Sequence, residues 1–319
     1  YDGGIEVFVR YLDKARQPLH DAPITMSCER DGITVEVSLE WTDAYHENTL
    51  GQLFCDDSAQ QIIDLLDAEC ADGGVTRRLG CAIHSVARSD DGRFVLATAH
   101  GEFDAESLVV ATGGLSIPAI GATPWGYRLA EQFGLAVTPL KPGLVPLTFD
   151  AAEQHAFGPL AGLSLDIAAS LGKASFREQG LFTHKGVSGP AILQISSYWQ
   201  AGQTIELDLL PSADAHDLLG QAVHSEQKLS NVLAQAWPKR FAVQWLAAQG
   251  VADAPMRQLN PKTLSALAAQ IHAWPIRPGG TQGYKKAEVT VGGVDTRELS
   301  SKTLMANKAP GLFFVGEVV

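Results

Sequence analysis

The chain has few cysteines and no long run of apolar residues. Its four cysteines, Cys28, Cys55, Cys70 and Cys81, are scattered and form no Cys-x-x-Cys pair. Separate thiols in a chain of 319 residues are typical of a reducing cytoplasm rather than of a disulfide framework. The longest apolar candidate, 108–120, is shorter than the roughly 18 residues of a membrane span and is interrupted by glycine and proline. The sequence therefore predicts a cytoplasmic protein with no membrane partner.

Positive charge is also scarce. Lys and Arg number 24 against 36 Asp and Glu, which gives a net charge of −12, and the chain has no dense Lys/Arg run. An acidic surface repels the phosphates of a nucleic acid, so we expect no nucleic-acid partner. Hydrophobic residues make up 45% and charged residues 19%, which is an ordinary globular composition. The length predicts about two domains at roughly 150 residues per domain.

Several motifs that carry chemistry are absent. No two glycines are separated by a single residue, so a G-x-G-x-x-G fingerprint cannot occur, and there is no P-loop. The nine histidines form no H-x-H or H-E-x-x-H motif, so we expect no metal site. Gly186-Val-Ser-Gly189 is one residue short of the G-x-S-x-G nucleophile elbow. We therefore favour a helix N-cap by Ser188 over a hydrolase nucleophile.

Periodicity predicts an α/β fold. Apolar spacing, capping signals and turn residues predict helices over 5–12, from the Ser58–Gln61 capping box to Gly73-Gly74, over 127–133 before Gly134, and over 190–199 and much of 213–274. Strand patterns occupy a hairpin over 25–41 with an Asp31-Gly32 turn, two segments around the turn at 90–92, most of 140–210, and 287–291 and 312–315. A continuous apolar run at 108–111 predicts a strand buried on both faces. The order predicts a sheet completed from both ends of a long insertion.

The two strands that flank this insertion end in glycine-containing segments. Leu108–Ala111 runs into Thr112-Gly113-Gly114, and Leu312–Val315 runs into Gly316-Glu317. Glycine at the carboxyl end of a parallel strand lets the backbone approach a cofactor, and a carboxylate there can accept hydrogen bonds from sugar hydroxyls. A plain turn is the better explanation of each segment on its own. The pair together leaves a cofactor site and an ordinary turn as open alternatives.

The first 48 residues resemble the B protein of DNA gyrase. The segments YDGGIEVFVRYLDKARQPLH and ERDGITVEVSLEWTDAYHEN are similar to the passage from its ATPase domain to its transducer domain. That family's nucleotide-binding motifs are absent, so the resemblance implies no ATPase or topoisomerase activity. Because the similarity stops near residue 48 and the chain has no initiator Met, we interpret the chain as chimeric and as a fragment.

Residues 50–319 resemble the BaiN-type, aminoacetone oxidase-like FAD-dependent oxidoreductases. The motifs are SLVVATGGLSIPAIGATPWGYRLAEQFG, LFTHKGVSGPAILQISSYW, AEVTVGGVDTRELSSKTL and PGLFFVGEVV. The resemblance implies a partial Rossmann-like FAD domain over 50–139 and 287–319, a β-rich domain over 140–211 and 275–286, and a helical domain over 212–274. Residues 1–48 are expected to form a separate helix and hairpin. The resemblance of residues 50–319 also implies redox chemistry on a small-molecule substrate through FAD, with NAD(P)H as the expected reductant.

The same resemblance implies a set of cofactor-binding residues. They are Ile83, Ala111, Thr112, Gly113, Gly114, Gly316 and Glu317 around the cofactor, and Gln52, Phe54, Thr290, Gly292 and Gly293 near the flavin ring. No residue is assigned as a catalytic acid or base, and the substrate and oligomeric state stay open. A non-enzymatic, cofactor-free fusion, or a gyrase-B-related interaction segment on a scaffold, is the alternative function.

Overall fold

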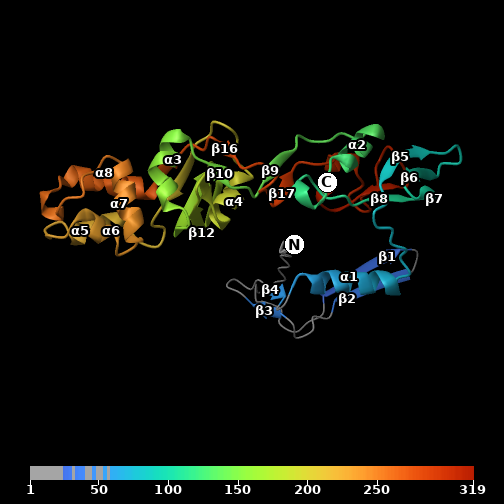
Figure 1. Cartoon of the computed structure of the whole chain (residues 1–319), viewed down its shortest axis with the longest axis horizontal. Coiled ribbons are helices and arrows are strands. Elements are labelled where there is room, and N and C mark those ends of the chain that lie inside the picture. Colours follow the sequence, from blue (N-terminus) through green and yellow to red (C-terminus); the bar gives the residue numbers. More distant parts are fainter. Residues whose placement is uncertain (1–23, 31–32, 40–44, 48–52, 56–57) are drawn as a thin grey trace. The chain divides into compact units, whose positions relative to one another are not determined.

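The structure is a computed structural model, and it describes residues 24–30, 33–39, 45–47, 53–55 and 58–319. The chain divides into two compact units, residues 1–82 and 83–319. The predicted helix over 5–12 and the predicted Asp31-Gly32 turn lie outside the described residues. Figure 1 shows the elements coloured along the sequence.

In its described residues, the first unit contains two antiparallel strand pairs and one helix. β1 (Ile24–Arg30) pairs with β2 (Ile33–Leu39), with Arg30 opposite Ile33, so the predicted hairpin strands are confirmed. β3 (Tyr45–Glu47) pairs with β4 (Leu53–Cys55). The helix α1 (Gln60–Asp72) follows.

Local hydrogen bonds fix both ends of α1. The Ser58 hydroxyl accepts a hydrogen bond from the Gln60 N–H at 3.0 Å, but the N-cap of α1 is Ala59, which has no side-chain cap, so the predicted capping box with Ser58 as N-cap is wrong. The helix ends at Gly73, and Gly74 has a φ of +70° that suits glycine. Two of the apolar residues whose spacing predicts this helix are exposed in the described part of the chain, since Ile63 is 39% and Leu66 54% accessible.

The second unit begins with an antiparallel three-stranded sheet. It consists of β5 (Ile83–Arg88), β6 (Phe94–Thr98) and β7 (Gly101–Ala105). The Gly92 N–H donates to the Ser89 carbonyl at 2.9 Å, which confirms the predicted turn at 90–92. α2 (Trp125–Gln132) follows further along the chain and ends before Gly134, whose φ is +75°.

Strands from the two sides of the insertion pair as predicted. β8 (Leu108–Val110) and β18 (Leu312–Phe314) run parallel, with Val110 opposite Phe314. Val110, Phe314 and Tyr127 share one apolar cluster. The prediction that β8 is buried on both faces is wrong, because Val109 is 57% exposed while Val110 is 2% exposed. Only the face of β8 toward that cluster is covered by the described residues.

A larger antiparallel sheet occupies the insertion. Its strand order is β15-β14-β11-β12-β13-β10-β16. The bounds are β10 (Leu147–Thr148), β11 (Ser164–Leu171), β12 (Ala174–Phe182), β13 (Gly186–Ser188), β14 (Ile205–Asp208), β15 (Trp274–Ile276) and β16 (Gly280–Thr281). A separate pair, β9 (Lys141–Gly143) with β17 (Val289–Val291), stands where the chain enters and leaves the insertion.

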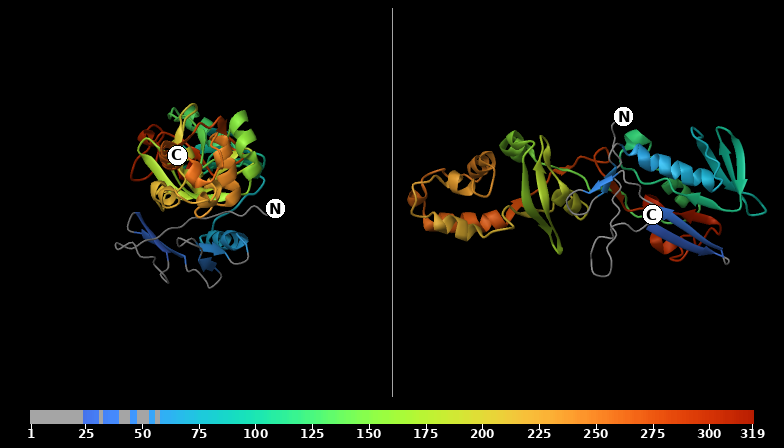
Figure 2. Two further views of the ribbon diagram at one scale, coloured as in Figure 1. Left: turned by 90° about the vertical axis from the view of Figure 1, so that its left-hand side faces the viewer. Right: turned by 90° about the horizontal axis from the view of Figure 1, so that it is seen from below.

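Helices accompany this sheet, as Figures 1 and 2 show. They are α3 (Ala151–Phe157), α4 (Pro190–Ser196), α5 (Ala215–Gln221), α6 (Leu229–Leu233), α7 (Lys239–Ala248) and α8 (Pro261–His272). Short 3-10 turns are η1 (Pro118–Ile120), η2 (Gly158–Leu160), η3 (Met256–Gln258), η4 (Thr296–Glu298) and η5 (Gly316–Val318). α4 begins after Gly189, whose φ is +87°, and its N-cap is Gly189. The predicted Ser188 cap is therefore wrong, because Ser188 belongs to β13 opposite Leu181.

One apolar core joins the seven-stranded sheet to the helices. Trp237 and Trp274 flank the fully buried Trp245 edge to face, with ring centroids 5.5 and 6.5 Å from it. His272 at the end of α8 lies 2.9 Å from the Asp208 carboxylate through Nδ1 and accepts the Ala215 N–H at Nε2, 3.0 Å away. These contacts tie β14, α5 and α8 into one body.

The mixed α/β class is confirmed by this architecture. The four-part domain division, like the Rossmann-like description of 50–139 and 287–319, stays a prediction. No helix among the described residues is both long enough and apolar enough to cross a membrane.

Candidate functional site

Three segments that are far apart in the sequence meet beyond β8 and β18. Parallel strands end at the same edge of a sheet, and here the edge is extended by the Val315 N–H, which donates to the Val110 carbonyl at 3.0 Å. The chain continues into Ala111–Gly114 after β8 and into Gly316 and Glu317 after β18. Thr290 comes from β17. We call this group, Ala111–Gly114 with Thr290, Gly316 and Glu317, the strand-end site.

Thr290 is the hydrogen-bonding centre of the strand-end site. Its backbone N–H donates to Oε1 of Glu317 at 2.6 Å, and its Oγ1 accepts from the Leu115 N–H at 2.7 Å. The Ser116 hydroxyl lies 3.2 Å from the same Oγ1. Thr290 itself is only 8% exposed, whereas Glu317 is exposed. The buried threonine thus orients a carboxylate that faces solvent.

Gly114 fits against these two side chains, with no room for a larger residue. A Cβ on Gly114 would lie 2.4 Å from Thr290 Oγ1 and 2.8 Å from Glu317 Oε1. Both separations are shorter than real Cβ contacts allow, so glycine at this position is a steric requirement. Gly114, Thr290 and Glu317 therefore lie together in this structure, while their role in cofactor binding stays a prediction.

Gly113 and Gly316 leave the backbone open on the outer side. Their φ angles are +69° and +75°, and a Cβ on either would meet no atom within 4 Å. Ala111, Thr112 and Gly316 are exposed. The strand-end site therefore combines a fixed inner wall at Gly114 with accessible backbone at Gly113 and Gly316.

Two tyrosines border the site from the inside. The Tyr127 hydroxyl of α2 donates to the Glu317 carbonyl at 3.5 Å, and Tyr127 is 3% exposed. Burial raises the pKa of Tyr127 above its usual value, and the charge of Glu317 adds to the effect. Burial also raises the pKa of Tyr284, whose carbonyl accepts the Ile117 N–H at 2.8 Å. Both phenols thus stay neutral near physiological pH.

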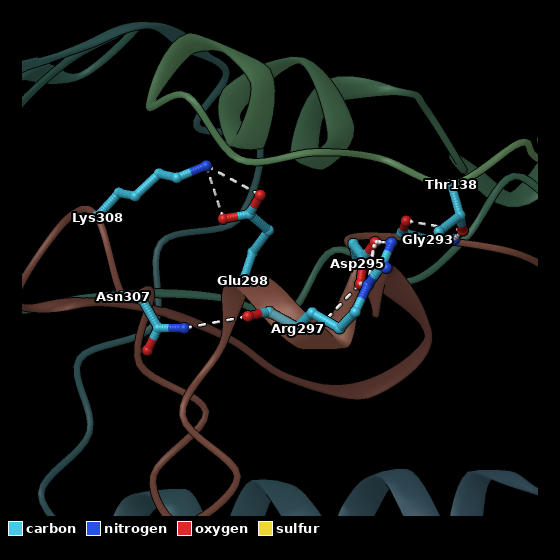
Figure 3. Close-up of polar contacts among 7 residues, drawn as sticks. All are labelled: Thr138, Gly293, Asp295, Arg297, Glu298, Asn307 and Lys308. Atoms are coloured by element: carbon cyan, nitrogen blue, oxygen red, sulfur yellow. Dashed lines mark hydrogen bonds and ion pairs between the residues drawn. The ribbon is translucent and has the colours of Figure 1, made fainter.

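The Gly292-Gly293 turn fixes the chain just after Thr290. Gly292 has a φ of +89°, and a Cβ there would lie 2.3 Å from the Pro139 carbonyl oxygen. The Gly293 N–H donates to Thr138 Oγ1 at 3.0 Å, and the Thr138 N–H donates back to the Gly293 carbonyl at 2.8 Å. Figure 3 shows Thr138 and Gly293 facing one another across this turn. These two glycines support the site from behind.

A polar network holds the η4 segment that follows the turn (Figure 3). Asp295 accepts from the Arg297 N–H at 2.9 Å and from the Arg297 guanidinium at 2.5–3.1 Å. Glu298 pairs with Lys308, and the Asn307 amide donates to the Arg297 carbonyl at 3.2 Å. The Asp295 N–H donates to the Ala136 carbonyl at 2.9 Å, which joins η4 to the segment after α2.

The Asp295 carboxylate gives this network a pH dependence. Hydrogen bonds from the Arg297 side chain and then from its backbone N–H lower the pKa of Asp295 from 3.8 to about 2. A carboxylate whose pKa is lower in the folded state stabilises the fold above its unfolded value, and this contribution is lost as the pH falls. We expect Asp295→Asn to flatten the loss of stability between about pH 4 and pH 2.

Urea unfolding midpoints across that pH range measure the effect, with Glu102→Gln on the exposed strand β7 as the control. Asparagine keeps an oxygen that accepts the Arg297 N–H, so the substitution removes the titration and retains part of the cap. Parallel pH profiles for Asp295→Asn and the unsubstituted protein would contradict the prediction.

The other predicted site residues are not brought to this place by any observed contact. Ile83 lies in β5 opposite Thr98 and packs beside the apolar cluster of Val110 and Phe314. Phe54 lies in β4 of the first unit, and Gln52 lies outside the described residues. Their roles stay predictions. Within the residues that the structure describes, no three His, Cys, Asp or Glu side chains are grouped to hold a metal ion.

Sequence reasoning missed the polar groups that surround Thr290. The Leu115 N–H, the Ser116 hydroxyl, Thr138 and Tyr127 all take part in holding the site. A signal was present in the polar Thr290 between two valines, since a polar residue in an apolar strand needs a hydrogen-bonding partner. The partners themselves come from distant segments, which no local pattern identifies.

Most of the chain is similar in sequence to known proteins. Residues 141–289, which include the seven-stranded sheet and α5–α8, match the family described as HI0933-like protein barrel and H2TH domain. The chain is 49% identical over 280 residues to the ribosomal RNA dihydrouridine synthase of Escherichia coli, which covers 86% of the chain and 70% of that protein. The chain belongs to the ribosomal RNA dihydrouridine synthase family. The Haemophilus influenzae member is 43% identical, with the same coverage of both chains.

Membership of the ribosomal RNA dihydrouridine synthase family corrects the BaiN-type identification. That identification is wrong, because these two relatives match the chain at 43–49% identity. A 3-dehydro-bile acid delta(4,6)-reductase of Clostridium scindens is 26% identical over 280 residues, covering 82% of the chain and 68% of that protein. The gyrase B protein of Myxococcus xanthus is 49% identical over 47 residues, only 15% of the chain and 6% of that protein. Matches this short do not show a chimeric chain.

Two further predictions are overturned with it. The predicted function, an NAD(P)H-linked oxidoreductase fragment of undefined small-molecule substrate, conflicts with relatives that are named for the modification of ribosomal RNA. The exclusion of a nucleic-acid partner is wrong for the same reason. Net charge describes the whole surface, whereas RNA contacts depend on local cations and on aromatic stacking, which a chain of charge −12 can still provide.

Proposed function

We propose that this chain forms the larger part of an enzyme that reduces a uridine of ribosomal RNA to dihydrouridine. The observation that carries the proposal is the 49% identity over 280 residues to the Escherichia coli ribosomal RNA dihydrouridine synthase. The reaction saturates the C5–C6 bond of uracil, which needs two electrons and two protons. No standard side chain supplies the electron pair, so the proposal includes a redox cofactor.

We propose FAD as the cofactor of the strand-end site. Gly113 and Gly316 leave open space where a side chain would otherwise stand, so a ligand can approach the backbone closely. The site lies outside the carboxyl ends of parallel strands, which is where open α/β sheets bind such ligands. Bound FAD supplies hydride chemistry, and the residues of this chain supply its position.

Each residue of the strand-end site has a distinct role in this proposal. Glu317 accepts a hydrogen bond from a sugar-type hydroxyl of the cofactor while Thr290 fixes its carboxylate through the 2.6 Å hydrogen bond. Gly114 allows both side chains to come together. The buried Tyr127 hydroxyl donates to the Glu317 carbonyl, which helps to hold the segment that carries this carboxylate. After each turnover, a two-electron reductant from solution must return the oxidised cofactor to its reduced form.

We expect Glu317→Ala to weaken FAD binding by roughly 10- to 150-fold, because a hydrogen bond to a charged group is worth about 1.5–3 kcal/mol. Glu317→Gln is expected to be milder, since an amide oxygen still accepts. Fluorescence titration with FAD measures the affinity of each variant apoprotein, expressed from its own gene. Glu131→Ala on the exposed side of α2 is the control. Equal affinities for Glu317→Ala and the unsubstituted protein would exclude Glu317 from the cofactor site.

The RNA part of the proposal is tested separately, by measuring dihydrouridine in ribosomal RNA from cells with and without the gene. The proposal requires the modified nucleoside to disappear with the gene.

A further inference from the structure

A shallow hollow of about 600 Å³ opens at the turn between β11 and β12. The turn at Gly172, Lys173 and Ser175 forms one side of it, and Phe176, Tyr198 and Gln203 form the other. Tyr198 lies just beyond the end of α4. The strand-end site uses none of these side chains.

Two aromatic rings line this hollow: Phe176 is half-buried and packs against the apolar core, whereas Tyr198 is exposed. The Phe176 and Tyr198 centroids are 5.6 Å apart with an interplanar angle of 40°. Tyr198 is 57% exposed, although exposing an aromatic ring to water forgoes the stabilisation that its burial provides. The face of an exposed, ring-supported tyrosine is a surface on which a flat base can stack.

Charge at the hollow suits an anionic partner. Lys173 is the charged residue among those that line it, and it is exposed at the turn. Lys173 thus puts a positive charge on the same hollow as the two aromatic rings. Nucleic-acid sites without sequence preference combine these two features, a base stacked on a ring and a phosphate near a cation.

The hollow is connected to the strand-end site through a short chain of contacts. Ser197 precedes Tyr198, and its carbonyl accepts from Lys141 Nζ at 2.9 Å while its Oγ accepts from the Leu144 N–H at 3.1 Å. Lys141 opens β9, which pairs with β17 so that Pro142 is opposite Thr290. The backbone that carries Tyr198 is thus anchored to the strand pair that carries Thr290.

We propose that the hollow at Lys173, Phe176 and Tyr198 binds an unpaired nucleotide of the RNA substrate, with its base stacked on Tyr198 and a phosphate beside Lys173. This inference rests on the proposed function, since it assigns a substrate-binding surface to the same enzyme. A uridine inside a duplex is stacked and must leave the helix before its ring can be reduced. A base held at the hollow would anchor the RNA strand while the target uridine reaches the cofactor.

The test is the affinity of the protein for a short, fluorescein-labelled single-stranded RNA, followed by fluorescence anisotropy. We expect Tyr198→Ala to weaken binding by roughly 5- to 150-fold, the range that alanine substitution of a stacking ring produces. Tyr198→Phe is expected to keep most of the affinity, because the ring is retained. Lys173→Ala is expected to lower the slope of log affinity against log salt by about 0.7, the share of one phosphate contact on a single strand.

Two variants control for general effects of the substitutions. Phe103→Ala on β7 removes an aromatic ring that is 39% exposed, and Lys262→Ala removes an exposed cation from the start of α8. Both are expected to bind the RNA with unchanged affinity. Unchanged affinity in Tyr198→Ala, or an equal loss in Phe103→Ala, overturns the proposal.

The outcomes separate this inference from the function on which it rests. If Tyr198→Ala loses RNA affinity and the unsubstituted protein forms no dihydrouridine, the RNA-binding surface is retained and the proposed reaction is rejected. Dihydrouridine formation with full RNA affinity in Tyr198→Ala would retain the reaction and reject the surface. A Tyr198→Ala variant that changes only the sedimentation of the protein would instead identify a contact between two copies, which also overturns the proposal.

Discussion

Replacing Gly114 with alanine is expected to disrupt the strand-end site strongly, because the added methyl group would collide with Thr290 and Glu317. The added Cβ would stand 2.4 Å from Thr290 Oγ1 and 2.7 Å from Thr290 Cβ, so the threonine or the Ala111–Gly114 segment must move. Overpacking of this kind typically costs about 1–3 kcal/mol of unfolding free energy. Movement of Thr290 also disturbs its hydrogen bonds to Leu115 and Glu317, and with them the proposed cofactor contact.

Two measurements check this expectation on the same protein. Urea unfolding should show the loss of stability, and titration with FAD should show a loss of affinity at least as large as that of Glu317→Ala. Gly220→Ala is the matched control, because Gly220 lies within α5, a Cβ there meets no atom within 4 Å, and alanine favours a helix. Equal FAD affinity for Gly114→Ala and Gly220→Ala would show that Thr290 and Glu317 do not form the cofactor site.

Helices, strands and turns whose conformation is set by a few neighbouring residues could be predicted from the sequence. The alternation over 33–39 and the glycines after α1 and α2 each specify a conformation within a few residues. The pairing of β8 with β18 was also predictable, because two short apolar strands flank one insertion. Burial was less predictable, since Val109 has the same apolar character as Val110 but faces away from the cluster.

The glycines and the carboxylate of the candidate site could be identified from the sequence. The residues that hold them in place could not. Gly114 and Glu317 follow strands that the sequence identifies, and glycine is required at Gly114 by a contact of 2.4 Å. Thr138 and Tyr127 reach the site through tertiary contacts across more than a hundred residues. Such contacts follow from the packing of whole elements, and no local pattern in the chain encodes them.

The substrate was predicted wrongly because the recognised motifs concern the cofactor. Strand-end glycines and a following carboxylate describe how a dinucleotide is held, and one fold with one cofactor serves many substrates. RNA recognition depends instead on where single rings and cations lie on the surface. Phe176 and Lys173 are separated by two residues, but Tyr198 joins them only through the fold.

Loss of the gene is expected to remove a dihydrouridine from ribosomal RNA completely, which is the most direct test of the proposed function. The expected effect is large because no uncatalysed reaction saturates uracil in RNA on a cellular timescale. Nucleoside mass spectrometry of purified ribosomal RNA separates uridine from dihydrouridine by the mass of two hydrogens. Restoring the gene should restore the signal, the Gly220→Ala variant should restore it equally, and the Gly114→Ala variant at matched abundance should restore less.

This nucleoside measurement decides the central claim. We expect dihydrouridine in ribosomal RNA when the gene is present and none at the affected position when it is deleted. An unchanged dihydrouridine content after deletion would contradict the proposed function.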